Sequence, residues 1–408
     1  MPIRRLEALS RAELARLGRE FMLYGHTYDR ALMPQVGMRL GGGKEIEPLS
    51  IWEWKGASPN YTRRMKRLMK IEGDDVTAIV KALQLDVGFP HEYMDVQFEL
   101  KPDGSAEFWL NHCGALMDVE KRGESAVVMM CHRIEDPTFD ATAVATNPRA
   151  RMRPIHRPPR TPADRHPHCH WTIKIEPGVE PVIEEPLTLE VGRLPLAKVP
   201  NERPADREPG GWHDYAGPFD AKFRLEHLSQ GALVAALREF SLQAHLLASS
   251  ASLYLLQRHE PSAVREVLAN QWAGTNWVTA ERIAAELGIA GGGIEAVAQV
   301  LALHPALPHG VSAALEPTGE RSVRLALSGP RELLDANAPG WLGLLAAGEA
   351  RPIEAIAQAV DPRARVTAEA PHAYAITVDP NAEPVAQPQS ATLTKLSTVA
   401  GWHFRDFA

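Results

Sequence analysis

The chain has 408 residues, a net charge of −7 and 45% hydrophobic residues. This composition is typical of a globular protein, and the acidic balance argues against general nucleic-acid binding, which needs a basic face. No apolar run approaches the ~18 residues of a membrane span, and Met1 is followed by Pro-Ile-Arg-Arg rather than by an apolar leader. With only three cysteines, an odd number, we expect reduced thiols in a cytoplasmic protein that does not contact membranes.

The sequence contains an internal duplication. Residues 5–26 align without gaps on residues 224–245, and Arg19-Glu20-Phe21 recurs there as Arg238-Glu239-Phe240. Later, NPRAR at 147–151 recurs as DPRAR at 361–365, and WTIKIEP at 171–177 recurs as YAITVDP at 374–380. The residues shared by a further block are Trp54, Gly56, Arg64, Gly73, Leu83, Leu85, Pro90 and His91, which recur as Trp272, Gly274, Arg282, Gly291, Leu301, Leu303, Pro308 and His309. Collinear matches of these residue types predict two homologous halves.

Each half is expected to begin with an amphipathic helix, for which Ser10 and Ser229 are placed as N-caps. In the first half, a second helix is then expected over 61–85, interrupted near Gly73. The remaining expected elements are a hairpin of strands 93–100 and 106–112, a strand over 127–131, a helix over 137–145 and a strand over 170–176.

This order predicts an α+β fold of two tandem halves, each a helical lead-in followed by a small, mostly antiparallel sheet with packed helices. The expected boundaries are 1–177 for the first half, 178–223 for a proline-rich linker that could include a strand over 187–191, 224–380 for the second half and 381–408 for the tail. We expect the halves to pack through their lead-in helices about a pseudo-twofold axis. The aromatic end of the tail is expected to dock on the rest of the chain.

All three cysteines lie in one window of the first half, and each has a histidine neighbour. The pairs are His112-Cys113, Cys131-His132 and His168-Cys169-His170. The second half has no cysteine and loses the neighbouring histidines, which favours a site confined to the first half. Cysteines that simply pack in a core are the alternative, because Leu and Ala replace Cys easily there.

Residues two apart on a strand share a face, so strand alternation predicts that the three thiols converge on one face of the sheet. Thiolate and imidazole suit zinc or iron, and the candidate metal ligands are Cys113, Cys131, His132, His168, Cys169 and His170. The same three cysteines and His132 are the candidate catalytic residues, as a thiolate nucleophile with a histidine base. The spacings match no zinc-finger pattern, and a haem held by Cys or His is a further alternative.

An arginine-rich run follows at 149–160, where the first half carries an insertion of about ten residues relative to the second. The run has five arginines and no acid, and arginine forks bind carboxylate or phosphate bidentately. Arg149 and Arg151 recur in the second half, which indicates a structural role. We therefore predict that Arg153, Arg157 and Arg160 bind an anionic ligand; a solvated turn that pairs with acidic surface is the alternative.

The order of these motifs resembles a known family. A cysteine after a hairpin is followed by Cys131-x-x-x-Glu135, an aliphatic helix, NPRARM, RPPR and HCHWTIKIE. This order is similar to bacterial proteins of the L-2-amino-thiazoline-4-carboxylic acid hydrolase-like family. The closing Cys-x-Trp strand is also similar to the small-molecule-binding 4-vinyl reductase domain, whose sensor members hold zinc with cysteines. The resemblance implies a pocket for a small anionic molecule beside the cysteines.

Two classes of function follow from these patterns. The first is an enzyme that acts on a small anionic molecule at the Cys/His site, with the second half as a structural pseudo-domain. The second is a non-catalytic protein that binds or senses a small molecule, a metal or haem. In either case the protein could form oligomers.

Overall fold

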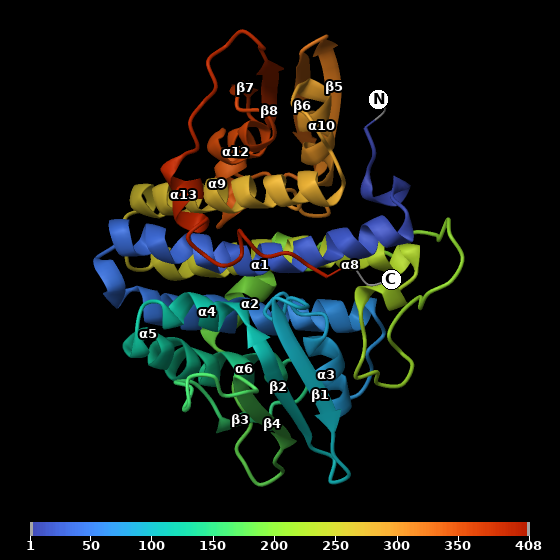
Figure 1. Cartoon of the computed structure of the whole chain (residues 1–408), viewed down its shortest axis with the longest axis vertical. Helices are drawn as coiled ribbons and strands as arrows, with labels where there is room; N and C mark the ends of the chain where they lie inside the picture. Colours follow the sequence, from blue (N-terminus) through green and yellow to red (C-terminus); the bar gives the residue numbers. More distant parts are fainter. Residues whose placement is uncertain (1–2, 406–408) are drawn as a thin grey trace.

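The computed structural model describes residues 3–405 and has the predicted α+β architecture (Figure 1). The elements of the first half are α1 (Arg11–Arg39), α2 (Ile46–Leu68), α3 (Val76–Leu83), β1 (Met94–Leu100), β2 (Ala106–Cys113), α4 (Gly114–Glu120), α5 (Glu124–Val128), a π-helical turn (Met129–Ile134), α6 (Glu135–Val144), β3 (Ala150–His156), β4 (Cys169–Ile175) and α7 (Pro186–Arg193). The elements of the second half are α8 (Gln230–Leu256), α9 (Pro261–Glu286), α10 (Ile294–Leu303), β5 (Ser312–Gly319), β6 (Ser322–Ser328), α11 (Trp341–Ala346), α12 (Arg351–Val360), β7 (Ala364–Ala370), β8 (Ala373–Val378) and α13 (Gln389–Thr394).

The two halves have the same topology, which confirms the duplication. Each contains one four-stranded antiparallel sheet, with strand order β1-β2-β4-β3 in the first and β5-β6-β8-β7 in the second. The sheets lie at opposite ends of the molecule, and the long helices α1, α2, α8 and α9 are layered between them (Figure 1). Ser10 caps α1 and Ser229 caps α8, as predicted.

The lead-in helices are exchanged between the halves. Helix α1 packs along α9 of the second half, and α8 packs along α2 of the first half. Helices α1 and α8 also pack on each other in the middle of the molecule (Figure 1). The helical layer of each half is thus completed by a helix from the other half, and the two halves share one hydrophobic core.

Two ion pairs related by the duplication cross between the halves. Arg64 on α2 donates from Nε and Nη2 to both carboxylate oxygens of Glu239 on α8, at 3.0 and 2.6 Å. Its counterpart Arg282 on α9 donates in the same way to Glu20 on α1, at 2.6 and 3.0 Å. Both pairs are buried, and burial raises the pKa of Glu20 even though Arg282 opposes the shift.

A pair of duplicated glycines allows the next layer of helices to approach closely. A Cβ on Gly56 of α2 would lie 3.0 Å from the Leu187 side chain of α7, and a Cβ on Gly274 of α9 would lie 2.5 Å from the Thr394 hydroxyl of α13. Helix α7 packs on α2 as α13 packs on α9. The segments after each sheet are therefore equivalent parts of the repeat.

Two predicted strands are helices in the structure. The run over 127–131 was predicted as a strand, but it lies at the end of α5 and in the π-helical turn. A short apolar run fits a buried helix as well as a strand, so its periodicity does not decide between them. The run over 187–191 lies in α7, where Pro186 occupies the first turn, a position that favours helix initiation.

The helix predicted over 61–85 is two helices, because α2 ends at Leu68 and Gly73 adopts φ +89 before α3 begins. The arginine run at 149–160 was predicted as a loop, but its first part forms β3. This strand lies at the edge of the sheet, where Pro154 is tolerated because an edge strand has unpaired backbone positions. The hairpin and the closing strand β4 are confirmed within a residue or two.

The aromatic end of the tail docks on the junction between the halves, as predicted. Trp402 stacks on His112, with ring centroids 5.0 Å apart, and meets the edge of Tyr93 at 5.5 Å. Phe404 lies beneath the Arg282 guanidinium at 5.5 Å. Arg282 also donates to the carbonyl oxygens of Val399 and Trp402, so the tail closes this ion pair from solvent.

Replacing Glu20 by Gln is expected to lower the free energy of unfolding by about 3–5 kcal/mol, because the Arg282 guanidinium would keep its burial and lose its counter-charge. The measurement is chemical denaturation followed by tryptophan fluorescence. Glu369→Gln is the control, since Glu369 pairs with Arg324 at the surface and such pairs contribute about 0–1 kcal/mol. Equal effects of both substitutions would contradict a special role for the crossing ion pair.

Candidate functional site

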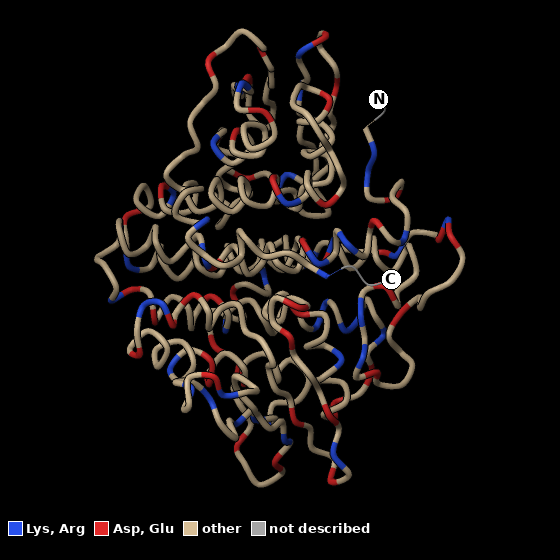
Figure 2. The backbone as a smooth tube through the Cα atoms, viewed as in Figure 1, with Lys and Arg blue, Asp and Glu red and all other residues tan. Residues whose placement is uncertain are grey.

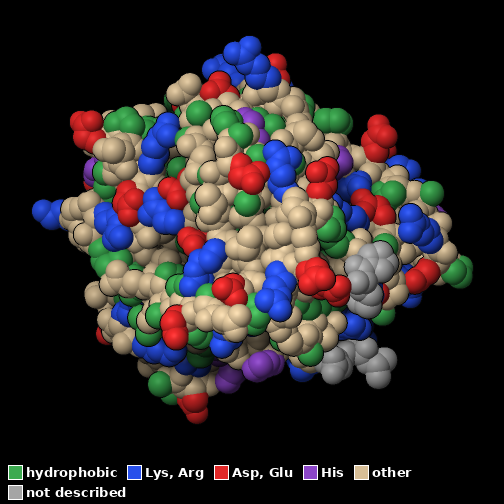
Figure 3. Space-filling view, turned by 90° about the horizontal axis from the view of Figure 1, so that it is seen from above, with side chains coloured by type: hydrophobic (Ala, Val, Ile, Leu, Met, Phe, Trp, Pro, Cys, Tyr) green, Lys and Arg blue, Asp and Glu red, His purple; other side chains and the backbone are tan. Residues whose placement is uncertain are grey.

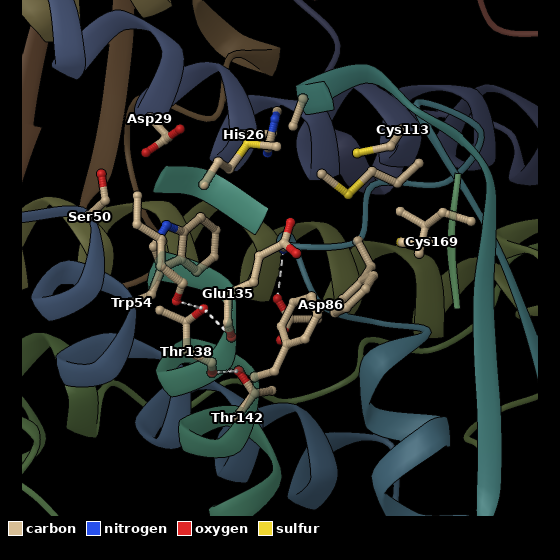
Figure 4. A pocket seen from close by; sticks show the side chains of 18 of the residues that line it. His26, Asp29, Ser50, Trp54, Asp86, Cys113, Glu135, Thr138, Thr142 and Cys169 are labelled. Atoms are coloured by element: carbon tan, nitrogen blue, oxygen red, sulfur yellow. Dashed lines mark hydrogen bonds between the residues drawn. The ribbon is translucent and has the colours of Figure 1, made fainter. Parts of the chain in front are cut away.

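The first half encloses a cavity of about 120 Å³ between its helices and its sheet. Its walls come from α1, α2, the segment before β1, β2, α6 and β4, and the labelled side chains in Figure 4 surround this common space. The apolar part of the wall includes Phe89, Leu110, Met130 and Phe139. An engineered cavity of about 150 Å³ holds one benzene molecule, so this cavity has room for a ligand of about that size.

Two carboxyl groups face the cavity without a basic side chain hydrogen-bonded to them among the described residues. Burial raises the pKa of Glu135 to about 8, although Arg157 and a hydrogen bond with the Cys131 thiol oppose the shift. Burial likewise raises the pKa of Asp86 to about 6, against hydrogen bonds from the Gly88 N–H at 2.7 Å and the Tyr61 hydroxyl at 3.0 Å. Glu135 therefore carries a proton at neutral pH.

The opposite wall of the cavity carries a neutral histidine and an ion pair between two side chains of the protein. Burial lowers the pKa of His26 to about 4, and neither ring nitrogen has a hydrogen-bond partner among the described residues. Next to it, Asp29 pairs with Arg30. The cavity thus combines two carboxyl groups that resist ionisation with no uncompensated positive charge.

The three predicted thiols do converge in the first half. Cys113 at the end of β2 and Cys169 at the start of β4 line the cavity, and Cys131 packs with them in the same apolar cluster. All three are buried and free. Burial raises the pKa of Cys113 to about 12 and raises those of Cys131 and Cys169 as well, so burial favours the protonated thiols in the metal-free protein, and their predicted roles as nucleophile or metal ligands stay predictions.

The histidines next to these cysteines do not line the cavity. The His170 ring contacts Glu107 at 3.0 Å on the other face of the sheet from Cys169, and the His132 ring bonds the Pro158 carbonyl oxygen at 2.7 Å. His168 packs between the rings of His112 and His166. Among residues 3–405, no group of three or more His, Cys, Asp or Glu side chains is arranged to hold a metal ion, and the expected zinc, iron or haem stays a prediction.

The three predicted arginines bind carboxylates of the protein. Arg153 donates from one nitrogen to both oxygens of Asp140 at 3.0 and 2.9 Å, and Arg160 holds Glu120 through two bonds of 2.9 Å. Arg157 pairs with Asp136 beside the Trp171 ring. Their predicted contact with an anionic ligand stays a prediction. The structural role of Arg151 is confirmed, because it and Arg365 each bond three backbone carbonyl oxygens in the same pattern.

In the second half, Trp341 occupies the equivalent of the cavity. His26 and Trp54 line the cavity of the first half, and their counterparts His245 and Trp272 both pack on the Trp341 ring, with centroid distances of 4.9 and 5.0 Å. Trp341 is fully buried. A separate space of about 20 Å³ lies between His245 and the segment 194–196, which is enough for about one water molecule.

The counterpart of Glu135 in the second half has a lowered pKa instead of a raised one. The alignment of residues 147–151 with 361–365 places Glu349 opposite Glu135. Arg351 donates two hydrogen bonds to Glu349, at 2.8 and 2.7 Å, and these bonds lower the pKa of that carboxyl. The first half has Pro137 at the position of Arg351, so its carboxyl lacks such a partner.

Sequence reasoning missed most of this site. Glu135 appeared only as the end of the Cys131-x-x-x-Glu135 motif, and Asp86, His26 and Trp54 gave no local signal. Comparing the halves position by position gives one usable signal. Position 135 is acidic in both halves, while the arginine that neutralises it occurs only in the second.

We expect the three thiols of the native protein to resist a disulfide reagent at pH 8, because they are buried and protonated. All three should react once guanidinium unfolds the chain. The measurement is the release of the coloured thiolate from the reagent over time. Rapid reaction of one thiol in the native protein would contradict this expectation and would support the nucleophile hypothesis for that cysteine.

No family model matches the chain, and neither do the curated proteins or the solved structures. The resemblance to the L-2-amino-thiazoline-4-carboxylic acid hydrolase-like family and to the 4-vinyl reductase domain therefore stays a prediction. No helix between residues 3 and 405 combines the length and the hydropathy required to cross a bilayer.

Proposed function

We propose that the first half binds a small organic amine in its cavity, in a cytoplasmic setting, with Glu135 as the group that recognises the positive charge. The observation that carries this proposal is a carboxyl group that lines an apolar cavity and has no hydrogen-bonded cation among residues 3–405. Transfer of a carboxylate into such surroundings is unfavourable unless an opposite charge compensates it. A ligand ammonium group supplies that charge.

Ligand size follows from the volume of the cavity. A cavity of about 120 Å³ is slightly smaller than one that holds benzene, so it accepts an amine no larger than benzene, such as a branched alkylamine of four carbon atoms. Phe89, Leu110 and Phe139 would contact the alkyl group, and Glu135 the nitrogen. The second half would not bind this ligand, since Trp341 fills the space and Arg351 neutralises Glu349.

A catalytic role is the second candidate, and the same residue favours it. General acid–base catalysis is most efficient when the pKa of the group lies near the operating pH, and the pKa of Glu135 is about 8. Glu135 would then accept or donate a proton at a bound substrate. The thiols, which stay protonated, would line the cavity rather than attack the substrate.

Isobutylamine is the probe for this proposal, with isobutyl alcohol as the uncharged comparison. Binding an ammonium group should ionise Glu135, so calorimetry at pH 7 in buffers of different ionisation enthalpy should show release of about one proton with isobutylamine and none with isobutyl alcohol. Glu135→Gln should abolish this release and weaken isobutylamine binding at least tenfold.

Glu349→Gln is the matched control and should leave both affinities unchanged. Failure of the parent protein to bind isobutylamine, or equal binding by the parent and Glu135→Gln, would contradict the proposal.

A further inference from the structure

A second, strongly basic pocket lies on another face of α2. It has a volume of about 520 Å³ and is lined by the C-terminal part of α2, the segment 192–201 and Glu239 of α8. Four cationic side chains line it, namely Arg63, Arg64, Arg67 and Lys198, against the single carboxylate of Glu239. The whole chain has a net charge of −7, so the net charge of this pocket is opposite in sign to that of the chain.

The cations come from one run of sequence. Residues 61–71 contain Arg63, Arg64, Lys66, Arg67 and Lys70 and no acid. Figure 2 shows basic residues gathered along α2 where this run lies. By contrast, acidic and basic side chains are interspersed over the face of the second half seen in Figure 3.

Two of these cations are free to meet a ligand. Arg64 is held by Glu239 and by the Ala197 carbonyl oxygen at 2.9 Å, and Arg63 pairs with Glu184. Arg67 and Lys198 are exposed, and neither has an ion-pair partner among residues 3–405. Asn201 adds a buried side-chain oxygen without a hydrogen-bond partner in the described structure, while its amide nitrogen bonds the Ala235 carbonyl oxygen.

The second half provides an internal comparison at the equivalent position. There the ion pair Arg282–Glu20 is closed by Phe404 and by the carbonyl oxygens of Val399 and Trp402. The counterparts of Arg63 and Arg67 are Glu281 and Ala285. The duplicated scaffold therefore accounts for Arg64 and not for the additional cations or for the open pocket.

We propose that this pocket binds a small phosphorylated polyol. Arginine and lysine together favour a phosphate dianion, and the free Asn201 oxygen requires a donor, which a ligand hydroxyl supplies. The volume of 520 Å³ is typical of sites for small molecules. This site is separate from the cavity that holds Glu135, because the two share no lining residue.

Calorimetric titration of the full chain with glucose 6-phosphate and with inorganic phosphate tests the proposal. Saturable binding of glucose 6-phosphate is expected, tighter than that of inorganic phosphate. Arg67→Glu and Lys198→Glu should each weaken it at least tenfold, and both sites are exposed, so the fold should tolerate the changes.

Arg331→Glu in the second half is the control, since Arg331 is also exposed and lies outside the pocket; it should bind like the parent. Absence of saturable binding, or equal affinities in the parent and in both pocket variants, would overturn the site. Equal affinity for the two ligands would overturn the role of the polyol.

Discussion

The structure depends on two reciprocal ion pairs that cross between its halves. Arg64 binds Glu239 and Arg282 binds Glu20, so each half supplies one cation and one anion to the same interface. A buried ion pair stabilises a fold little more than apolar packing would, but losing either partner leaves an uncompensated buried charge. The pairs therefore disfavour any other pairing of these helices, and the exchanged arrangement of α1 and α8 satisfies both of them.

The two halves share this helical scaffold but differ in the space between the helices and the sheet. In the second half, Trp341 fills the space beside His245 and Trp272, and Arg351 neutralises Glu349. In the first half the same space is open, and Glu135 lines it without such a partner. A cavity and a carboxyl group with a raised pKa both lower the free energy of unfolding, so their occurrence together in one half is consistent with a binding site there.

Much of the fold could be predicted from the sequence because its signals are local or repeated. The caps at Ser10 and Ser229, the hairpin and the matched blocks of the duplication are of this kind. The exchange of helices could not be predicted, since Arg64 meets Glu239 and not Glu20, and the alignment alone allows either pairing. Convergence of the thiols was predicted correctly, although Cys131 reaches the cluster from a helical turn and not from a strand. The charge environment of Glu135 was missed because it depends on burial, and because only a comparison of the halves shows that Arg351, which pairs with Glu349, has no arginine counterpart in the first half.

The most direct test of the claim that only the first half holds an open cavity is diffraction from crystals pressurised with xenon, which enters apolar cavities of this size. The anomalous signal should place xenon beside Phe89, Leu110 and Phe139, and no comparable signal should lie beside Trp272 and Trp341. Anomalous peaks of equal height in both halves, or no peak in the first half, would contradict the account.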